Sequence, residues 1–263
     1  MTAFVGDDPT TVVRPVALVT GAAGGVGSAV ASRFVAGGWQ VVVTDVDALG
    51  ARRTADGVGA MASLPGDLRD VEVCRSVVSG CVAATGRLDC LVNAAGVWTE
   101  GPTAETSEVE FDQVLGVNLK GLFFITAAAI PHLVTTSGCV VNLSSDAGVQ
   151  GNAGAAVYCA SKGAVSILSK ALALELAAQG VRVNAVCPGD VDTPMIRYQA
   201  ETFGGGDPEG YVRDLLAQYP QGAAARLIRP EEVAELIWFL AQPVAAPITG
   251  ANLSIDFGLS AGI

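Results

Sequence analysis

Basic residues are scarce in this sequence. Its 263 residues include 15 Lys and Arg against 26 Asp and Glu, and the net charge is -11. Binding to nucleic acid relies on clustered Lys and Arg that neutralise phosphates. The charge balance therefore argues against nucleic acid as a partner, and an acidic macromolecule is disfavoured for the same reason.

Cysteine pairs and histidines are also few. The 6 cysteines form no Cys-x-x-Cys pair and lie mostly in apolar runs, so we expect them to be reduced and buried in the core. The only histidine, His132, falls near the end of a predicted helix rather than in a motif, and we expect it to be structural. The sequence predicts no metal site.

Export and membrane signals are missing as well. The first residues, MTAFVGDDPTTVVR, carry acids where a secretory signal carries bases, and they contain no long apolar stretch. Residues 121–145 and 236–255 are long and uncharged. Each contains proline and several polar residues, so each is better interpreted as a helix followed by a strand. We therefore expect a cytoplasmic protein without a membrane partner.

What the sequence does contain is an alternation of short β-branched runs with longer helical patterns. With 51% hydrophobic residues, the chain can bury one large core. Alternating strands and helices are typical of βαβ units around a parallel sheet that is covered on both faces. We expect an α/β fold with a doubly wound parallel seven-stranded sheet, in a single domain over residues 13–263 that follows a flexible tail over residues 1–12. The expected strands are Val16–Thr20, Gln40–Thr44, Ala60–Leu64, Leu88–Val92, Cys139–Ser144, Arg182–Cys187 and Asn252–Ile255.

Residues 189–222 stand apart from this alternation. They are rich in Gly, Pro, Tyr and Asp and show no clear strand or helix period. Long connections in compact domains usually serve a function. We expect an irregular, mobile segment over a binding cleft.

The first predicted strand runs directly into a glycine-rich turn, Gly21-Ala-Ala-Gly-Gly-Val-Gly27, and an Ala-rich helical pattern follows. Glycines in such a turn let the backbone approach a pyrophosphate, and the free amides of the helix end face the anion. Asp45 ends the second strand, where a carboxylate can accept hydrogen bonds from the hydroxyls of an adenosine ribose. Because Asp47 follows closely, a 2′-phosphate would meet two acids. The sequence therefore favours NAD over NADP.

Other interpretations of this nucleotide end stay open. Arg52 and Arg53 on the next predicted helix have some reach toward a 2′-phosphate. Methyltransferases that bind S-adenosylmethionine also combine a glycine-rich first loop with an acid after the second strand. A glycine turn with a solvated aspartate could also be purely structural.

Tyr158 and Lys162 are the two large polar side chains in a stretch of small residues, VYCASKG. On a helix, residues i and i+4 share a face, so the ammonium would lie beside the phenol and stabilise its charged form. A tyrosine that normally titrates at roughly 10 would then act as acid or base closer to neutral pH. Both could also be ordinary residues of a helix surface.

Together these residues resemble one family, the short-chain dehydrogenases/reductases of the single-domain type. The resemblance covers residues from about 13 to 258, and the motifs occur in the family's order. The matching segments are Thr20-Gly21-x-x-x-Gly25-x-Gly27, Asn93-Ala-Ala-Gly96, Val-Asn118-Leu-Lys-Gly, Ser145 thirteen positions before Tyr158, and Pro188-Gly189 with Thr193. Two positions depart from the family pattern: Ala94 replaces the second asparagine of the common Asn-Asn-Ala-Gly form, and Phe257 replaces a glycine near the C-terminus.

The resemblance implies a Rossmann-type fold and assigns roles to these residues. Tyr158 would exchange a proton with the substrate oxygen, while Lys162 lowers the tyrosine pKa and binds the nicotinamide ribose. Ser145 would hydrogen-bond the substrate oxygen, and Asn118 would hold a water in a proton relay. The cofactor residues implied are Gly21, Gly25, Val26, Gly27, Asp45, Asp67, Leu68, Asn93, Gly96, Tyr158, Lys162, Pro188, Gly189, Val191 and Thr193.

The expected function is the reversible, NAD(H)-dependent oxidation of a secondary alcohol to a ketone. Expected substrate contacts are mostly apolar or aromatic, which favours a hydrophobic or cyclic substrate; they are Trp98, Asp146, Gln150, Met195, Tyr198 and Phe203. One alternative is a reductase of 3-oxoacyl thioesters on an acidic carrier protein, which the negative charge of this chain disfavours. A second alternative is a non-catalytic NAD-binding sensor. The resemblance also suggests a homotetramer.

Overall fold

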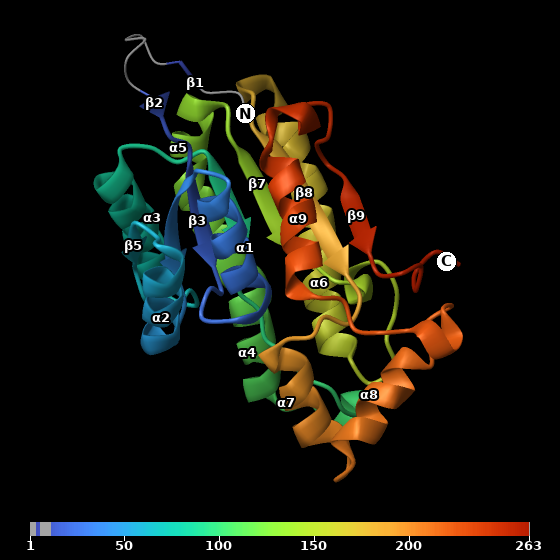
Figure 1. The fold of residues 1–263 in the computed structure, drawn as a ribbon. Helices are drawn as coiled ribbons and strands as arrows, with labels where there is room; N and C mark the ends of the chain where they lie inside the picture. Colours follow the sequence, from blue (N-terminus) through green and yellow to red (C-terminus); the bar gives the residue numbers. More distant parts are fainter. Residues whose placement is uncertain (1–3, 6–11, 263) are drawn as a thin grey trace.

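A computed structural model describes residues 4–5 and 12–262 (Figure 1). Two short strands, β1 (Phe4–Val5) and β2 (Val12–Val13), pair antiparallel with each other. The other residues of the predicted flexible tail, 1–3 and 6–11, lie outside the described residues. The domain start at residue 13 stays a prediction.

A seven-stranded parallel sheet forms the centre of the molecule, as predicted. The strand order is β5-β4-β3-β6-β7-β8-β9, so the chain winds outward from β3 in one direction and then returns to wind outward in the other. Three strands have the predicted bounds, and the other four differ at their ends. The strands are β3 (Val16–Thr20), β4 (Gln40–Thr44), β5 (Ala62–Ser63), β6 (Cys90–Asn93), β7 (Cys139–Leu143), β8 (Arg182–Pro188) and β9 (Asn252–Ile255).

Helices cover both faces of this sheet (Figure 1). Side chains of a strand alternate between faces, so in β3 Ala17 and Val19 contribute to one core while Val16 and Leu18 contribute to the other. Helices α1, α2 and α9 pack on the first face, and α3, α5 and α6 pack on the second. The helices are α1 (Gly25–Ala36), α2 (Ala48–Val58), α3 (Val71–Thr85), α4 (Glu108–Leu115), α5 (Leu122–Thr136), α6 (Ala156–Leu176), α7 (Pro194–Phe203), α8 (Pro208–Leu216) and α9 (Pro230–Ala241).

The prediction that residues 189–222 are irregular is wrong, because most of this segment is helical. It contains α7 and α8, which project below the sheet in Figure 1. Pro194 and Pro208 stand at the helix starts, where the missing amide of proline costs nothing, and the Asp207 carboxylate accepts a hydrogen bond from Gly210 N. The prolines that suggested a loop are therefore helix-start signals.

The predicted helix-and-strand interpretation of the two uncharged stretches is confirmed. Residues 121–145 contain α5 and β7, and residues 236–255 contain the end of α9 and β9. Two helical stretches, Glu108–Thr136 and Ala156–Gln179, are long and apolar enough by composition to cross a membrane. Both contribute buried residues to the core on the second face of the sheet, which accounts for much of their apolar character; they are Ile125, Ala129 and Leu133 in the first and Leu172, Ala173 and Leu176 in the second. The cysteines are buried as predicted, except that Cys159 is partly exposed.

Candidate active site

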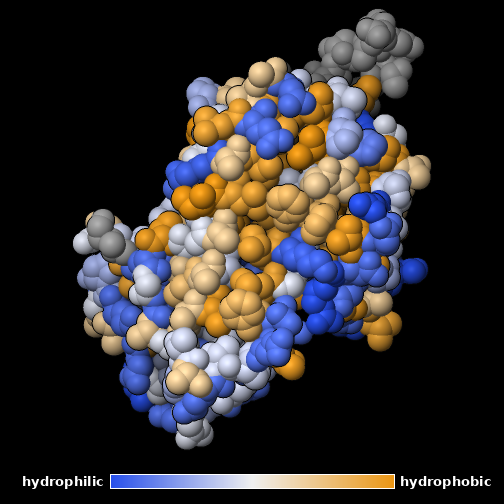
Figure 2. Space-filling view, turned by 180° about the vertical axis from the view of Figure 1, so that it is seen from behind, coloured by the Kyte–Doolittle hydropathy of each residue, from blue (hydrophilic) through white to orange (hydrophobic). Residues whose placement is uncertain are grey.

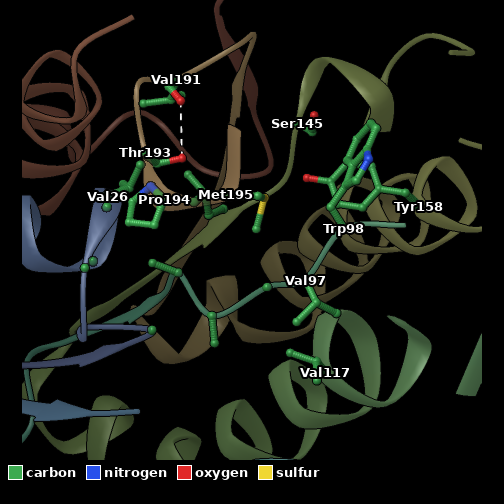
Figure 3. A pocket seen from close by; sticks show the side chains of 18 of the residues that line it. Val26, Val97, Trp98, Val117, Ser145, Tyr158, Val191, Thr193, Pro194 and Met195 are labelled. Atoms are coloured by element: carbon green, nitrogen blue, oxygen red, sulfur yellow. Dashed lines mark hydrogen bonds between the residues drawn. The ribbon is translucent and has the colours of Figure 1, made fainter. Parts of the chain in front are cut away.

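A cavity of about 570 Å³ opens at the carboxyl ends of the parallel strands. Loops that follow β3, β4, β6, β7 and β8 contribute to its wall, together with the start of α7. Ligands of open α/β sheets bind at this edge, near the point where the strand order reverses. Figure 3 shows the part of the cavity that contains Ser145, Trp98 and Tyr158.

The glycine turn between β3 and α1 forms one end of the cavity. A Cβ atom on Gly21, where φ is 68°, would lie 2.6 Å from Ala95 N. A Cβ atom on Gly27 would lie 2.2 Å from Gly21 O, so only glycine lets α1 pack this closely on the turn. Gly24 precedes α1 and no side chain caps the helix. The first amides of α1 therefore remain available for an anion in the cavity.

Asp45 lies on the cavity wall beside this turn. Its Oδ2 accepts a hydrogen bond from Ala23 N at 2.9 Å, and its Oδ1 accepts one from Asp47 N at 3.0 Å. These two amides hold the carboxylate in one orientation. Arg52 and Arg53 do not line the cavity; they pair with Asp56 at 3.1 Å and with Asp47 at 3.8 Å.

Asp67 and Leu68 line the cavity next to Asp45, as the resemblance implied. Arg69, which the sequence interpretation missed, lines it as well. Its guanidinium forms hydrogen bonds to both carboxylate oxygens of Asp67 and to Gln113 Oε1. The hydrogen bond from Arg69 lowers the pKa of Asp67, so this carboxylate stays ionised.

Ser145, Tyr158 and Lys162 lie together on the wall at the other end. Ser145 follows β7, and the other two lie one helical turn apart on α6. The Lys162 Nζ lies 5.7 Å from the centre of the Tyr158 ring and donates a hydrogen bond to Leu143 O at 2.7 Å. Trp98 packs against the other residues here, with its ring centre 4.3 Å from that of Tyr158 (Figure 3).

The ionisation of this group differs from the sequence prediction. Burial raises the pKa of Tyr158, whereas the neighbouring Ser145 hydroxyl lowers it. The predicted lowering by Lys162 is not found in the protein alone, because desolvation is the largest influence on the phenol. Burial also lowers the pKa of Lys162 to about 8. The two groups are adjacent as predicted, but the ammonium does not by itself make the phenol more acidic.

Asn118 lies behind the cavity wall rather than on it. It belongs to a π-helical turn, Gly116–Gly121, between α4 and α5. Its amide accepts a hydrogen bond from Val97 N at 2.8 Å and donates to Val97 O at 3.0 Å and to Ser161 Oγ at 3.0 Å. The side chain therefore fixes the backbone beside Trp98. Single π-helical turns inside helices are frequent at functional sites.

Most of the predicted cofactor residues line the cavity, and Asn93 does not. Its side chain lies in the core, where it donates to Thr126 Oγ1 at 2.9 Å and to Asn142 Oδ1 at 2.8 Å. Asn93 thus connects β6 to its neighbours instead of facing a ligand. The cavity-lining members are Gly21, Gly25, Val26, Gly27, Asp45, Asp67, Leu68, Gly96, Tyr158, Lys162, Pro188, Gly189, Val191 and Thr193.

The predicted substrate contacts divide into three residues on the cavity wall and three away from it. Trp98, Asp146 and Met195 line the cavity, whereas Gln150, Tyr198 and Phe203 do not. Gln150 contacts the site only indirectly, through a 3.0 Å hydrogen bond to Asp146. Tyr198 and Phe203 lie on α7 and pack edge to face against each other with ring centres 6.1 Å apart. Because the segment is a helix, its consecutive residues point in different directions, and only one face reaches the cavity.

Asp190 is a cavity-lining residue that the sequence interpretation missed. Burial and the neighbouring Asp146 raise its pKa to about 6. Its nearest polar partner, Tyr219, lies 29 positions further along the chain, and no local pattern connects the two. The one available signal was its place in the Pro-Gly-x-x-x-Thr segment.

Comparison with known proteins shows the family of this chain. Residues 21–260 match the family described as Enoyl-(Acyl carrier protein) reductase. The chain is 37% identical over 255 residues to meso-2,3-butanediol dehydrogenase of Serratia marcescens, and the match covers 94% of this chain and 94% of that protein. This chain belongs to the short-chain dehydrogenase/reductase family. It is therefore an oxidoreductase by family, and the methyltransferase interpretation is wrong.

Solved structures of the family superpose on nearly the whole chain. The 3-ketoacyl-(acyl-carrier-protein) reductase of Brucella melitensis, complexed with NADH, is 32% identical with a TM-score of 0.84 and covers 94% of this chain and 98% of its own. An actinorhodin polyketide ketoreductase with NADPH is 36% identical with a TM-score of 0.87 and covers 94% of this chain and 97% of its own. Short-chain dehydrogenases/reductases with either cofactor thus share this fold.

Proposed function

We propose that this protein is an NAD(H)-dependent dehydrogenase that interconverts a secondary alcohol and a ketone. One observation carries the proposal. Ser145, Tyr158 and Lys162 share a single cavity with the glycine turn and Asp45. A proton-transfer group and a nucleotide-binding turn at opposite ends of one cavity suit hydride transfer between a dinucleotide and a small substrate.

The residues at the glycine turn fit a dinucleotide. Added Cβ atoms at Gly21 and Gly27 would collide with neighbouring backbone atoms, so the turn keeps its backbone exposed to the cavity. Asp45 and Asp47 line the same end and would repel a 2′-phosphate. Arg52 and Arg53 do not line the cavity, and each is paired with an acid of α2 or its cap. These contacts favour NAD over NADP.

The chemistry follows from the positions of three side chains. When a nicotinamide cofactor is bound at the glycine turn and Asp45, it would supply the hydride chemistry. In alcohol oxidation, Tyr158 accepts the proton of the substrate hydroxyl as a phenolate, and Ser145 hydrogen-bonds the same oxygen. Lys162, anchored by Leu143 O, provides positive charge at 5.7 Å from the ring and a donor toward the ribose. The hydrogen bond with Ser145 favours the phenolate and acts against the effect of burial on the pKa of Tyr158.

The cavity wall near Tyr158 favours a substrate with an apolar carbon skeleton. Several apolar side chains from separate elements converge there, as Figure 3 shows. They are Val97, Trp98, Val117, Met195 and Ile196. A hydrophobic or cyclic alcohol would replace water on this wall at a gain of roughly 25 cal/mol for each Å² buried.

A screen of secondary alcohols and ketones that follows NADH and, separately, NADPH absorbance tests the proposal. Activity with NAD and a free alcohol is expected. Tyr158→Phe should lower turnover by about 10³-fold, while calorimetry should show NADH binding close to that of the wild type. Full activity of this variant would remove the mechanism. NADH binding without turnover of any alcohol or ketone would instead support the sensor function.

The second candidate is a 3-oxoacyl thioester reductase. It is favoured by the description of the matched family and by the named activity of the Brucella melitensis structure. The net charge of -11 disfavours docking of an acidic carrier protein. Turnover of a carrier-bound 3-oxoacyl thioester well above that of a matched free ketone would decide for this candidate.

We further propose a cytoplasmic homotetramer. Apolar side chains gather on the back of the molecule, where α5 and α6 lie (Figure 2). Phe123 is 43%, Ile167 65% and Leu174 84% exposed on these helices. Exposed apolar side chains that gather on one face commonly mark a protein–protein interface. Light scattering should give four chains for the wild type and a smaller species for Leu174→Glu, while Leu49→Glu on α2 should behave like the wild type.

A further inference from the structure

The substrate end of the cavity is the part lined by Trp98, Ser145, Tyr158 and Met195. Two carboxylates at this end have no part in the proton transfer described above. Asp146 and Asp190 both line the cavity that contains Ser145 and Tyr158. Asp146 directly follows Ser145 and is 8% exposed, and Asp190 follows β8. Two acids in one largely desolvated space raise each other's energy when both are charged, so their presence needs a compensating interaction.

Asp146 is held in place by neutral donors. Its Oδ1 accepts a hydrogen bond from Ser145 Oγ at 2.7 Å. Its Oδ2 accepts from Gln150 Nε2 at 3.0 Å and from Asn152 Nδ2 at 3.3 Å. These donors fix the carboxylate beside the catalytic serine, but they do not neutralise its charge.

Asp190 has a single side-chain donor among the described residues. The Tyr219 hydroxyl accepts a hydrogen bond from Asp190 N at 2.7 Å and donates to Asp190 Oδ2 at 3.1 Å. The other carboxylate oxygen, Oδ1, receives no hydrogen bond from the described part of the chain. Burial, together with the charge of Asp146, raises the pKa of Asp190 to about 6, while the Tyr219 hydrogen bond lowers it.

Neither acid forms an ion pair with a described residue. The ion pairs in the described part of the chain involve other carboxylates, including Asp192 with Arg197 close to Asp190 in sequence. Lys162 lines the cavity, but its Nζ donates to Leu143 O. The substrate end of the cavity therefore combines an apolar wall with two carboxylates that no ion pair neutralises. A ligand that carries both an apolar group and a cationic group complements this surface.

We propose that the substrate is a vicinal amino alcohol with an apolar substituent, whose ammonium group binds between Asp146 and Asp190. This inference rests on the proposed dehydrogenase function and deepens it. Asp146 Oδ1 lies 2.7 Å from Ser145 Oγ, so an ammonium that Asp146 binds would lie close to the substrate oxygen that Ser145 binds, as it does in a vicinal amino alcohol. A neutral hydroxyl in the same place would donate one hydrogen bond, whereas an ammonium donates three and balances the charge.

The reaction of such a substrate balances without a further reactant. The carbinol C–H bond breaks, and its electron pair moves with the hydrogen as hydride to the nicotinamide of NAD. The hydroxyl proton passes to Tyr158 as the C=O bond forms. The ammonium keeps its protons throughout, and the product is an amino ketone.

Three alcohols that differ at one group test the inference: 2-amino-1-phenylethanol, 1-phenyl-1,2-ethanediol and 1-phenyl-1-propanol. Calorimetry of each with the enzyme–NADH complex measures binding without reaction, and NAD reduction measures turnover. We expect the amine to bind at least about 30-fold more tightly than the alkyl analogue. Equal affinity for amine and alkyl groups, or tighter binding of the diol, would overturn the inference.

A variant pair localises the effect. Asp190→Asn should reduce the ratio of amine to alkyl affinity by about tenfold or more. Asp192→Asn, two positions away and paired with Arg197 at the surface, should leave that ratio unchanged. An unaltered ratio in a folded Asp190→Asn protein would contradict the inference. Oxidation of the alkyl alcohol with NAD would in that case still support the proposed dehydrogenase, whereas absence of NADH binding would contradict the dehydrogenase itself.

Discussion

The two ends of the cavity are built in different ways. The nucleotide end consists of backbone at the carboxyl ends of buried strands, with Gly21 and Asp45 held within a few residues of β3 and β4. The substrate end combines the loop after β6, the turn after β7, the loop after β8 and the start of α7, and α8 supports it from behind through Glu100. Its contacts join residues far apart in the chain, such as Tyr211 with Glu100. Local sequence therefore describes the first end well and the second poorly.

Glycine in the nucleotide end should be the least replaceable residue of the cavity. Gly27→Ala places a Cβ 2.2 Å from Gly21 O, so the turn or α1 must shift. We expect a loss of roughly 2–4 kcal/mol in the free energy of unfolding and at least about 100-fold weaker NADH binding. Thermal unfolding and calorimetry measure the two effects.

Gly57→Ala is the matched control for this change. Gly57 lies within α2, and a Cβ there meets no atom within 4 Å. Alanine suits a helix better than glycine by roughly 0.5–1 kcal/mol, so this variant should be as stable as the wild type or more so. Equal tolerance of alanine at both positions would mean that the glycine turn does not have the described geometry.

Asp45 should set the cofactor preference. Asp45→Ala removes the acceptor of Ala23 N and the negative charge that faces the ribose end. We expect the ratio of kcat/KM with NAD to that with NADP to fall by roughly 30-fold. Glu72→Gln, an exposed change on α3, should leave the ratio as it is. A wild-type preference for NADP would contradict this account of the nucleotide end.

Ionisation of Asp190 at the substrate end should lower the stability of the folded protein as pH rises. The pKa of Asp190 is raised from 3.8 to about 6, so the folded protein holds its proton more firmly than the unfolded chain. Ionisation therefore lowers stability as pH rises through this range, with Asp146 and Tyr219 as the groups that face it. Asp190→Asn should raise Tm by roughly 3 °C at pH 8 and leave it unchanged at pH 4.

The outcome that contradicts this is a Tm difference of equal size at both pH values. Asp192→Asn provides the control, because its carboxylate is half exposed and pairs with Arg197. Its Tm should follow the wild type across the same pH range. The comparison separates the buried acid of the cavity from an ordinary surface acid.

The smallest effect on activity is expected for a change at Glu100, where the loop after β6 meets α8. Glu100 Oε2 accepts hydrogen bonds from Trp98 Nε1 at 2.8 Å and from the Tyr211 hydroxyl at 2.6 Å. This carboxylate thus connects the loop beside Tyr158 to α8. Glu100→Gln replaces one charged acceptor by a neutral one, so KM should rise by about threefold to tenfold with little change in kcat.

Glu105→Gln, in the same loop but exposed, should change KM by less than about twofold. If both variants behave alike, the Glu100 contacts do not position the substrate wall. A fall in kcat alone for Glu100→Gln would mean that this residue acts on the chemical step instead.

Prediction succeeded where a short pattern has one physical solution. The β-branched runs specified strands buried on both sides, and the glycine spacing specified a turn that no side chain would fit. Tyr158 and Lys162 share a face because four residues make about one helical turn. The resemblance to the family supplied Ser145, and the cavity brings all three together.

Prediction failed where a side chain's direction depends on distant packing. Tyr198 and Phe203 have suitable chemistry for an apolar substrate, but α7 turns them toward each other. Asn93 was assigned to the cofactor and Asn118 to a water of the proton relay, and the amide of each forms hydrogen bonds with neighbouring segments of the chain. Arg69 and Asp190 were missed because only the folded sheet places them on the cavity wall.

The sequence alone determined the class of chemistry: the order of strands and helices, the glycine turn, and the acid–base pair on one helix face. These depend on contacts within a few residues, and local geometry decides them. The tertiary structure alone decided which polar groups face the substrate and how strongly they feel burial. Desolvation and the approach of Asp146 to Asp190 arise only when separate loops meet at one edge of the sheet, since electrostatic energy depends on distance in space and not on distance along the chain.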